Sequence, residues 1–543
     1  MATEQPRRLV QAGQWCALTA ALGALGYFVA SFHPARWQPR VESAWLIAVA
    51  GVIVWAWRAD TPSMPRLRHP YWFYALYLAA FLPFATNWRW AMTGDSLGWP
   101  FAGLALAEHG PDHSLLSSAG VAQFGYLQMV LHNAFMLLIA PTLFWHRVGQ
   151  IVVGLLALAA VFTVAARLVA PRFGLLVAAC AASTSVMIVH TLCSYPLLDG
   201  IACGQTILAV GLWVRRDPGS RRAWLALGFL TGFMLFLTPT AWFMALCVWA
   251  WLGPQVFLRR WSGTNLAIAA GVALVSGLPM LLQWSHGHGG QLFSLVEHPA
   301  WTLDKIGRFL RQAACLPFAS TVEVAGAFGP QLPPGFRWFF VVGILITPVC
   351  GRRFPGARFM ACIYLAHVVM LALSQGPYAD VSVKRALVLI PMATYFVFLP
   401  FHRYLRSLPL VLLLIAAWAA CGVYDVTARM RPGRIGYNLF DGVVEAHQRF
   451  REPVCIVMRH DPRVQGFTRG SRLDQLYGLW PHVQHAHAFS EDACRSVLCW
   501  APEADDIDLG ALGYDDVPLL SSGELRCGRK RELPPVDSGR QTP

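Results

Sequence analysis

Two isolated carboxylates, Asp95 and Asp199, are the side chains in the apolar part of the chain that are best suited to chemistry. Asp95 lies in Gly94-Asp95-Ser96, just after an apolar run that ends at residue 86, and Asp199 precedes the apolar run that begins at residue 201. A carboxylate held at a membrane surface can act as a general base or bind a cation. Either residue could instead cap a helix, because Asp accepts hydrogen bonds from the free N–H groups of the first turn.

Basic side chains next to apolar runs form a second group with chemical potential. Lys384 and Arg385 stand directly before the apolar run 386–401, and Arg147 stands directly before the run 148–168. One Arg side chain can donate two parallel hydrogen bonds to two oxygens of a phosphate, so this placement suits a lipid phosphate at headgroup depth. Ordinary anchoring in the headgroup layer is the alternative for each of these side chains.

The composition predicts that membrane helices position these residues. Of the 543 residues, 56% are hydrophobic and only 13% are charged, which excludes a soluble multidomain enzyme. Thirteen apolar runs are each long enough, or nearly so, to cross about 30 Å of hydrocarbon. The predicted spans are 15–32, 44–57, 71–86, 148–168, 173–192, 201–214, 223–237, 241–252, 266–284, 338–350, 359–373, 386–401 and 408–423. We therefore expect an all-α polytopic membrane region over residues 1–423.

The distribution of arginine predicts the orientation of these spans. Residues 1–423 carry 28 Lys and Arg against 12 Asp and Glu, and short loops such as 215–222 hold the basic residues in dense clusters. Because short cytoplasmic loops collect basic residues, we expect the N-terminus in the cytoplasm. The long loops 87–147 and 285–337, both carboxylates and the C-terminal tail then lie on the opposite side of the membrane. The near absence of lysine is typical of a GC-rich bacterial genome.

The apolar segment 125–144 decides this topology. As a further span it would invert everything after it and export the arginine cluster at 215–222. His132, Asn133 and Pro141 interrupt its apolar character. We therefore predict a helix that lies in the outer interface or dips into it.

Residues 424–543 differ in composition from the rest of the chain. They carry 15 Lys and Arg against 17 Asp and Glu, and an amphipathic stretch at 437–449 precedes a strand-like run at 454–458. This pattern predicts a small α/β extracytoplasmic domain with a disordered end after residue 532.

The cysteines of this tail are expected in an oxidising compartment. Cys494 and Cys499 could close a small loop, and Cys455 with Cys527 could staple the tail. Spacing alone leaves the pairing open.

Other familiar motifs are missing from the sequence. It contains no Walker A loop and no Rossmann fingerprint, which argues against an ATP-driven pump. His482, His485 and His487 lack a Cys or carboxylate partner at a known ligand interval, so no metal site is predicted from them.

The order of the features resembles that of a known superfamily. Gly94-Asp95-Ser96 is followed by an amphipathic run ending at Gly110, then by the interfacial segment and by Trp145-His146-Arg147-Val148-Gly149 at the start of a span. Tyr195-Pro196-Leu197-Leu198-Asp199 and Lys384-Arg385 before a span containing Pro391 come later. Over roughly residues 70–400 this layout resembles the C-type glycosyltransferase superfamily, polytopic enzymes such as the protein mannosyltransferases and the lipid A aminoarabinose transferases.

Two local differences separate the chain from the usual pattern of that superfamily. Asp95-Ser96 stands where many members have an Asp-Glu pair, and Thr238-Pro239-Thr240 stands where many have a Lys. Both differences bear on metal use and on activity.

The resemblance implies a fold and an activity. The fold would be the glycosyltransferase C-type arrangement of about 13 transmembrane helices in a bacterial inner membrane. The activity would be transfer of a sugar from a polyprenyl-phosphate donor to a lipid, glycan or protein acceptor of the envelope. Asp95 would be the general base, Asp199 would position the acceptor or a divalent cation, and Lys384, Arg385 and Arg147 would hold the lipid phosphate. No other cofactor and no nucleic acid are implied.

Three other functions fit the same sequence features. A transporter or flippase would also use charges inside a helix bundle, although it predicts them near the midplane. An O-antigen polymerase or ligase would use a large outer loop, which residues 285–337 could supply. A catalytically silent envelope scaffold would explain the missing Glu beside Asp95.

Overall fold

The computed structural model describes the parts of the chain that form most of the helices and one sheet. These residues are 48–49, 51, 67–86, 100, 103–104, 106–107, 130–192, 198–236, 239–258, 261–283, 303–315, 317, 332–349, 356–373, 387–405, 407–429, 440–457, 483–486, 494–500, 508–519 and 525–531.

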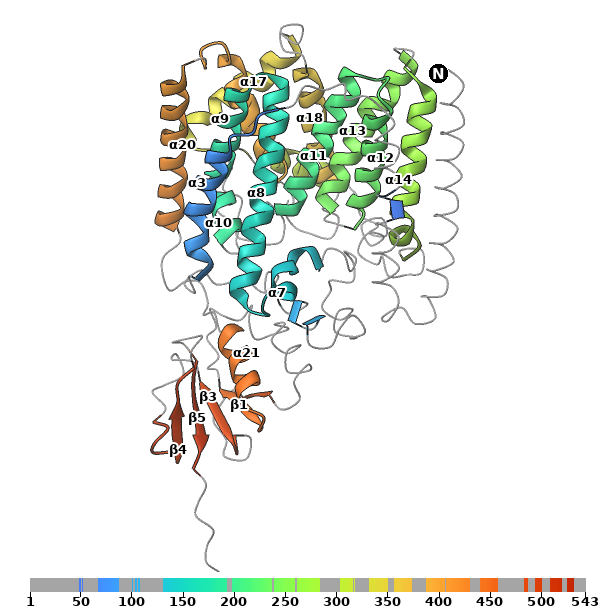
Figure 1. The fold of residues 1–543 in the computed structure, drawn as a ribbon. Coiled ribbons are helices and arrows are strands. Elements are labelled where there is room, and N and C mark those ends of the chain that lie inside the picture. Colours follow the sequence, from blue (N-terminus) through green and yellow to red (C-terminus); the bar gives the residue numbers. More distant parts are fainter. Residues whose placement is uncertain are drawn as a thin grey trace, which may run out of the picture.

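Helices that run side by side form a bundle, with a small sheet beyond one end of it (Figure 1). The α-helices are α3 (Tyr71–Phe81), α7 (Ala134–Leu138), α8 (Leu143–Leu168), α9 (Pro171–Ala182), α10 (Ser185–Leu192), α11 (Leu198–Arg216), α12 (Arg221–Met234), α13 (Pro239–Leu258), α14 (Gly263–Gln283), α16 (Leu303–Cys315), α17 (Arg337–Val349), α18 (Ala357–Leu373), α19 (Leu389–Phe398), α20 (Leu408–Arg429) and α21 (Phe440–Arg449). Short 3-10 helices are η1 (Leu82–Thr86), η5 (Pro334–Phe336) and η7 (Leu399–Phe401).

Three of the described helices are long and apolar enough to cross a membrane. They contain Phe144–Leu168 of α8, Ala241–Leu258 of α13 and Leu408–Thr427 of α20. Shorter apolar helices coincide with other predicted spans, including α14, α17, α18 and α19. The part of the chain described here is thus a mostly helical, polytopic fold, and the total of thirteen spans stays a prediction. The first predicted span, 15–32, lies outside the described residues, as does most of the second, 44–57.

One predicted span, 173–192, is broken in the structure. Its two halves, α9 and α10, meet at an angle of 66°. At the break, the Ser183 hydroxyl donates to the carbonyl of Ala179 at 2.8 Å, and the Thr184 hydroxyl donates to that of Ala181 at 2.9 Å. These hydroxyls bond to carbonyls of the preceding helical turn, so both are satisfied inside the apolar bundle at the point where the chain bends.

The described part of the ambiguous segment 125–144, residues 130–144, holds a helical turn at 130–132, the short helix α7 and the start of α8. Helix α7 has five residues, which span about 8 Å and cannot cross a bilayer. The chain then turns, and α8 begins at Leu143, five residues before the predicted start at residue 148. His146 and Arg147 are therefore part of the first turn of α8.

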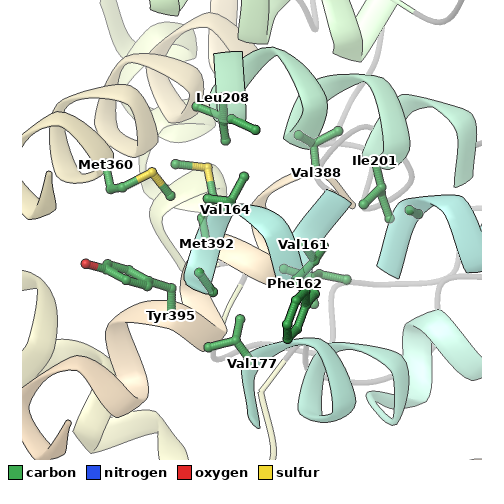
Figure 2. Close-up of a cluster of buried hydrophobic side chains, with 14 of the residues drawn as sticks. Val161, Phe162, Val164, Val177, Ile201, Leu208, Met360, Val388, Met392 and Tyr395 are labelled. Carbon is green, nitrogen blue, oxygen red and sulfur yellow. The ribbon is translucent and has the colours of Figure 1, made fainter. Parts of the chain in front are cut away.

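The bundle has one large apolar core. It joins buried side chains from α8, α9, α11, α12, α13, α18 and α19. Figure 2 shows a part of it in which Val161 and Phe162 of α8, Val177 of α9, Leu208 of α11 and Tyr395 of α19 lie in one cluster. Because such packing fixes each helix against several others, the helix ends that carry polar residues are held on a rigid frame.

The C-terminal region contains a five-stranded mixed sheet. The strands are β1 (Val454–Val457), β2 (Val483–Ala486), β3 (Val497–Trp500), β4 (Tyr514–Val517) and β5 (Arg526–Lys530), in the order β2-β1-β3-β5-β4. Strand β1 pairs in parallel with β2 and β3, whereas β5 runs antiparallel to β3 and β4. Figure 1 shows α21 beside this sheet, between it and the helix bundle.

Two disulfides cross-link the sheet, and they differ from the pairings considered from spacing. Cys455 of β1 joins Cys494, and Cys499 of β3 joins Cys527 of β5. The second pair lies directly opposite each other in the antiparallel register. Spacing left the pairing open, because the order of the strands decides which cysteines are neighbours.

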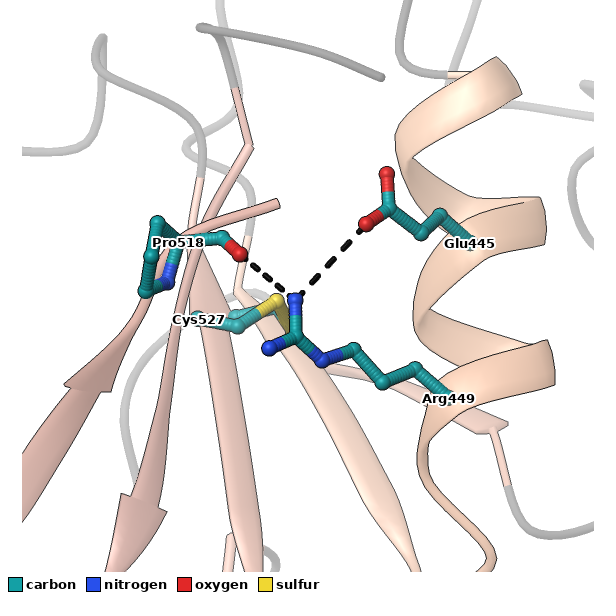
Figure 3. Close-up of a disulfide and its surroundings, with 5 residues drawn as sticks. Glu445, Arg449, Pro518 and Cys527 are labelled. Carbon is teal, nitrogen blue, oxygen red and sulfur yellow. Dashed lines mark hydrogen bonds and ion pairs between the residues drawn. A yellow bond between two sulfur atoms is a disulfide. The ribbon is translucent and has the colours of Figure 1, made fainter. Parts of the chain in front are cut away.

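The surroundings of the second disulfide tie α21 to the sheet. Arg449 donates a hydrogen bond to the carbonyl of Pro518 at 2.6 Å and lies 3.8 Å from the carboxylate of Glu445, one turn earlier on α21. Figure 3 shows this arrangement beside Cys527. Helix α21 is therefore joined to the sheet at Pro518, the residue that follows β4.

Candidate active site

Asp199 lies in the first turn of α11, one residue after the helix begins. Its Oδ1 accepts a hydrogen bond from the backbone N–H of Gly200 at 2.7 Å. The side chain thus bonds one free amide of the first turn from a position inside the helix, which is not the N-cap arrangement considered as the alternative. The residue is only 7% exposed, however, so its second oxygen also needs a partner inside the protein.

That partner is His132, which comes from the helical turn before α7. Its Nε2 lies 3.2 Å from Oδ2 of Asp199. His132 is 1% exposed, so both members of the pair are shielded from solvent. A buried carboxylate is stable as an anion only with partners of this kind, and this pair is more than a local helix cap.

Gln150 of α8 holds the other side of the His132 ring. Its Nε2 lies 2.8 Å from Nδ1 of His132 and 3.4 Å from the backbone oxygen of the same residue. Gln150 is fully buried. The three side chains therefore form a hydrogen-bonded chain from α8 through the segment before α7 to α11.

A second buried pair adjoins this chain at the start of α8. Nδ1 of His146 lies 2.9 Å from Oδ1 of Asn133, the residue after His132. His146 and Gln150 are four residues apart, so they share one face of α8. Arg147, beside His146, is 2% exposed. The first two turns of α8 thus bury a charged and two polar side chains within five residues. We call His132, Asn133, His146, Arg147, Gln150 and Asp199 the buried polar network.

The chain segment that follows Asp95 packs against this network. A Cβ atom placed on Gly103 would lie 2.5 Å from Cγ of Asn133, closer than real contacts allow. Leu104 is fully buried and Leu106 is 7% exposed. The absence of a side chain at residue 103 therefore lets this segment approach Asn133 directly.

The chain segment that follows Lys384 and Arg385 contacts α11, the helix that carries Asp199. Nε2 of Gln205 on α11 lies 3.5 Å from the carbonyl oxygen of Val388, and a Cβ on Gly204 would lie 3.0 Å from the Val388 side chain. At 1.5 Å per residue, these contacts are about 8 to 9 Å along α11 from Asp199.

The predicted site residues can now be located in part. Asp199 and Arg147 both belong to the buried polar network. Asp95, Lys384 and Arg385 lie outside the described residues. Their neighbours in sequence, Gly103 and Val388, contact the helices and turns that carry the network, as described above. Figure 1 shows α7 and the start of α8 at the end of the bundle that faces the sheet.

Sequence reasoning missed His132 and Gln150 as site residues. His132 and Asn133 were used only to interpret the segment 125–144, and Gln150 was taken as part of an apolar run. The sequence did contain a signal for them. A polar side chain inside an apolar run costs free energy to bury unless it has a polar partner. His132 contacts Asp199 across 67 residues of sequence, and Gln150 contacts His132 across 18.

Metal ligands show no clustering in this region. Among the described residues, no three His, Cys, Asp or Glu side chains lie together in a way that could hold a metal ion.

Comparisons with known proteins give structural similarities at low sequence identity. No protein-family model matches the chain, and no curated protein matches it in sequence. The crystal structure of ArnT from Cupriavidus metallidurans bound to undecaprenyl phosphate is 12% identical, with 85% of this chain and 98% of that chain covered and a TM-score of 0.45. The apo structure of the same protein is 13% identical, with 84% and 97% covered and a TM-score of 0.44.

A third similar structure is a larger protein. The arabinosyltransferase EmbB from Mycobacterium smegmatis, solved by cryo-EM, is 13% identical, with 72% of this chain and 44% of that chain covered and a TM-score of 0.35. ArnT and EmbB belong to the C-type glycosyltransferase superfamily that the sequence resembles. At these identities and TM-scores, the likenesses carry no inference about substrate or catalytic residues.

Proposed function

We propose that the chain is an integral membrane glycosyltransferase that moves a sugar from a polyprenyl-phosphate donor to an envelope acceptor on the extracytoplasmic side. The observation that carries this proposal is the buried polar network, in which Asp199 is held by His132 while segments that follow Asp95 and Lys384-Arg385 pack nearby. An anionic and a cationic group at one end of a helix bundle suit a reaction on a lipid phosphate.

The proposed chemistry is a displacement at the anomeric carbon. An acceptor hydroxyl or amine attacks that carbon, the bond from carbon to the phosphate oxygen breaks, and its electron pair leaves with the polyprenyl phosphate. Asp95 takes the proton of the acceptor. Asp199 orients the acceptor, and Arg147, Lys384 and Arg385 stabilise the charge that develops on the leaving phosphate.

The position of the network favours an enzyme over a transporter. Among the described residues, the buried Asp and Arg side chains are Asp199, Arg147 and Arg222, and each lies within the first two turns of its helix, α11, α8 and α12 respectively. A transporter would be expected to place its ionisable groups near the midplane. Chemistry on a lipid headgroup instead needs them at the membrane surface.

The side of the membrane is proposed from two features. Arginine-rich loops, such as the one at 215–222, lie at the end of α11 opposite Asp199. The C-terminal sheet with its two disulfides suits an oxidising compartment and lies at the end of the bundle near α7. We therefore place residues 1–423 in the bacterial inner membrane, with the N-terminus in the cytoplasm, and residues 424–543 outside it as a separate domain.

A turnover assay on purified protein tests this proposal. The wild type and the Asp95→Asn variant, both in detergent, are given a pool of polyprenyl-phosphate sugars and native envelope acceptors, and the released polyprenyl phosphate is measured. Asp304→Asn, at an exposed carboxylate on α16, is the matched control. We expect the control to match the wild type and Asp95→Asn to lose about 100-fold or more.

Two results would contradict the proposal. Equal turnover of the wild type and Asp95→Asn would mean that Asp95 is a helix cap and that the base lies elsewhere. If none of the three proteins releases polyprenyl phosphate, a transporter or a scaffold becomes the better interpretation.

A further inference from the structure

The last turns of α8 and α11 carry basic residues that the chemistry described above does not use. Arg167 lies in the last turn of α8, and Arg215 and Arg216 lie in the last turn of α11. The two helices lie side by side in the bundle (Figure 1). At 1.5 Å per residue, Arg167 lies about 26 Å along α8 from Gln150, and Arg216 lies about 26 Å along α11 from Asp199. Because the hydrocarbon layer is about 30 Å thick, a network at one membrane surface puts these arginines at the headgroup layer of the other.

The backbone at Gly356 brings the two helix ends together. A Cβ placed on Gly356 would lie 2.4 Å from Cδ2 of Leu168 on α8 and 3.3 Å from a guanidinium nitrogen of Arg215 on α11. The residue has a φ of +91°, a conformation that glycine adopts without strain. The last turns of α8 and α11 therefore meet at one short segment before α18.

A third segment adds His69, which lies just before α3. Its ring centroid is 5.2 Å from that of Phe162 on α8, and its Nδ1 is 2.8 Å from the hydroxyl of Tyr74. Burial lowers the pKa of His69, and the nearby charge of Arg167 lowers it further. At neutral pH a neutral imidazole thus lies within electrostatic range of Arg167.

The arginines of the two helices face each other without a carboxylate between them. Arg167 and Arg216 lie close enough for their charges to repel each other. In the described part of the chain, no ion pair or hydrogen bond is made by either guanidinium. Asp217 follows Arg216 directly, but its Oδ1 lies at the next turn, 3.7 Å from where a Cβ on Gly219 would be. An anion that binds both arginines would remove the repulsion.

Two general rules account for only part of this arrangement. Cations are favoured near the C-terminal carbonyls of a helix, and short cytoplasmic loops collect arginine. Both rules apply to each arginine separately. Neither requires that arginines of two helices approach each other beside a histidine of a third segment.

We propose that the last turns of α8 and α11 bind a phosphate group of net negative charge, at headgroup depth on the membrane side opposite Asp199. Arg167 and Arg216 donate hydrogen bonds to its oxygens, and His69 lies beside Arg167. An anionic phospholipid presents such a group at this depth, and a soluble phosphate compound presents the same group from water. The site does not depend on the proposed function, since sugar transfer is placed at the other end of both helices.

Binding to the full-length protein in a neutral detergent tests this site. Native mass spectrometry measures retention of phosphatidylglycerol and of phosphatidylcholine, whose headgroup has no net charge. Thermal unfolding measures the effect of each lipid and of inorganic phosphate. We expect the wild type to retain phosphatidylglycerol and to release phosphatidylcholine. Equal retention of the two lipids would overturn the proposal.

The same measurements distinguish the two sources of the phosphate group. Stabilisation by phosphatidylglycerol alone would assign the site to a lipid headgroup. Stabilisation by inorganic phosphate alone would assign it to a soluble phosphate compound. Stabilisation by neither would overturn the proposal.

A matched pair of variants separates the site from the general positive charge of this surface. Arg216→Gln removes one charge from the site, and Arg403→Gln removes one from an exposed residue in the turn after η7. We expect the affinity for phosphatidylglycerol to fall about 10-fold in Arg216→Gln. In Arg403→Gln it should change by less than about twofold, because salt screens an exposed charge elsewhere. Equal weakening in both variants would overturn the proposal.

Thermal unfolding of the variants separates ligand binding from a structural role. Without lipid, Arg167→Gln and Arg216→Gln relieve the repulsion, so both should unfold at or above the temperature of the wild type. With phosphatidylglycerol the order should reverse, because the wild type gains more stability from binding. Arg216 is exposed, so its variant should fold even if Arg167→Gln does not. Loss of stability in Arg216→Gln without lipid would overturn the proposal, because it would mean that Arg216 is satisfied within the protein.

Discussion

The start of α8 and the contact between α12 and α14 both contain buried residues, yet the residues that make the contacts differ in chemistry. At α8 and α11, polar side chains are paired through His132, Gln150 and Asp199. At α12 and α14, small residues bring the backbones together. A Cβ on Gly228 would clash with the carbonyl oxygen of Ala269, and one on Gly232 would clash with Ser276.

We propose that this difference separates residues that hold the bundle together from residues that act in turnover. Close backbone approach through glycine stabilises helix pairs in a membrane. There, an apolar side chain gains no hydrophobic free energy when it moves from lipid into a helix interface, so tight packing has to hold the helices together. A paired polar network contributes little net stability there, because each group must give up water. The polar end is therefore better explained by function, and the glycine contacts by folding.

The largest expected effect is on folding, at the glycine contact. Gly232→Leu would force α12 away from α14, and overpacking of this kind costs about 3 kcal/mol or more. We expect a large loss of folded protein, measured by the yield of the monodisperse species and by its thermal unfolding. Gly271→Leu on α14 is the control, because nothing lies within 4 Å of a Cβ at that position. Equal behaviour of the two variants would break the comparison.

A smaller effect is expected where a glycine meets the polar network. Gly103→Ala would press on Asn133 and displace the segment that follows Asp95. We expect turnover to fall by about 10-fold, whereas thermal unfolding changes by less than the Gly232 variant, since one flexible side chain can yield. A drop in stability without loss of turnover would assign this contact to folding.

The smallest effect on the bundle is expected from the C-terminal sheet. Replacing Cys455 and Cys494 by serine removes one cross-link and should destabilise the sheet by about 2 to 4 kcal/mol. The helices should be unaffected, so thermal unfolding of the bundle should stay the same. Protease sensitivity of residues 440–531 measures the change. Unfolding of the bundle together with the sheet would show that the two regions depend on each other.

The sequence predicted the helices well because long apolar runs and arginine clusters are local signals. The helices α8, α11 and α20 fall within or around predicted spans, and β1 was expected within 454–458. The bend between α9 and α10 was not predicted, because Ser183 and Thr184 can bond to their own helix as easily as they can end it.

Of the candidate site, only the isolated charged residues could be predicted from the sequence. Asp199 and Arg147 stood out because charged residues are rare in apolar surroundings. His132 and Gln150 did not, since their importance comes from contacts between segments far apart in sequence. The disulfide pairs could not be predicted from the sequence either. They follow from the strand order β2-β1-β3-β5-β4, which brings together segments far apart in sequence.

The central claim is that the buried polar network acts in turnover and is not needed for folding. Asp199→Asn tests it most directly, because the amide keeps the shape and one of the two acceptor oxygens while it removes the charge. Turnover of polyprenyl-phosphate sugar and thermal unfolding are measured on the same purified samples, beside the wild type and Gly232→Leu. We predict that Asp199→Asn loses about 100-fold or more in turnover and unfolds like the wild type. Full turnover in Asp199→Asn, or a loss of stability as large as that of Gly232→Leu, would contradict the account.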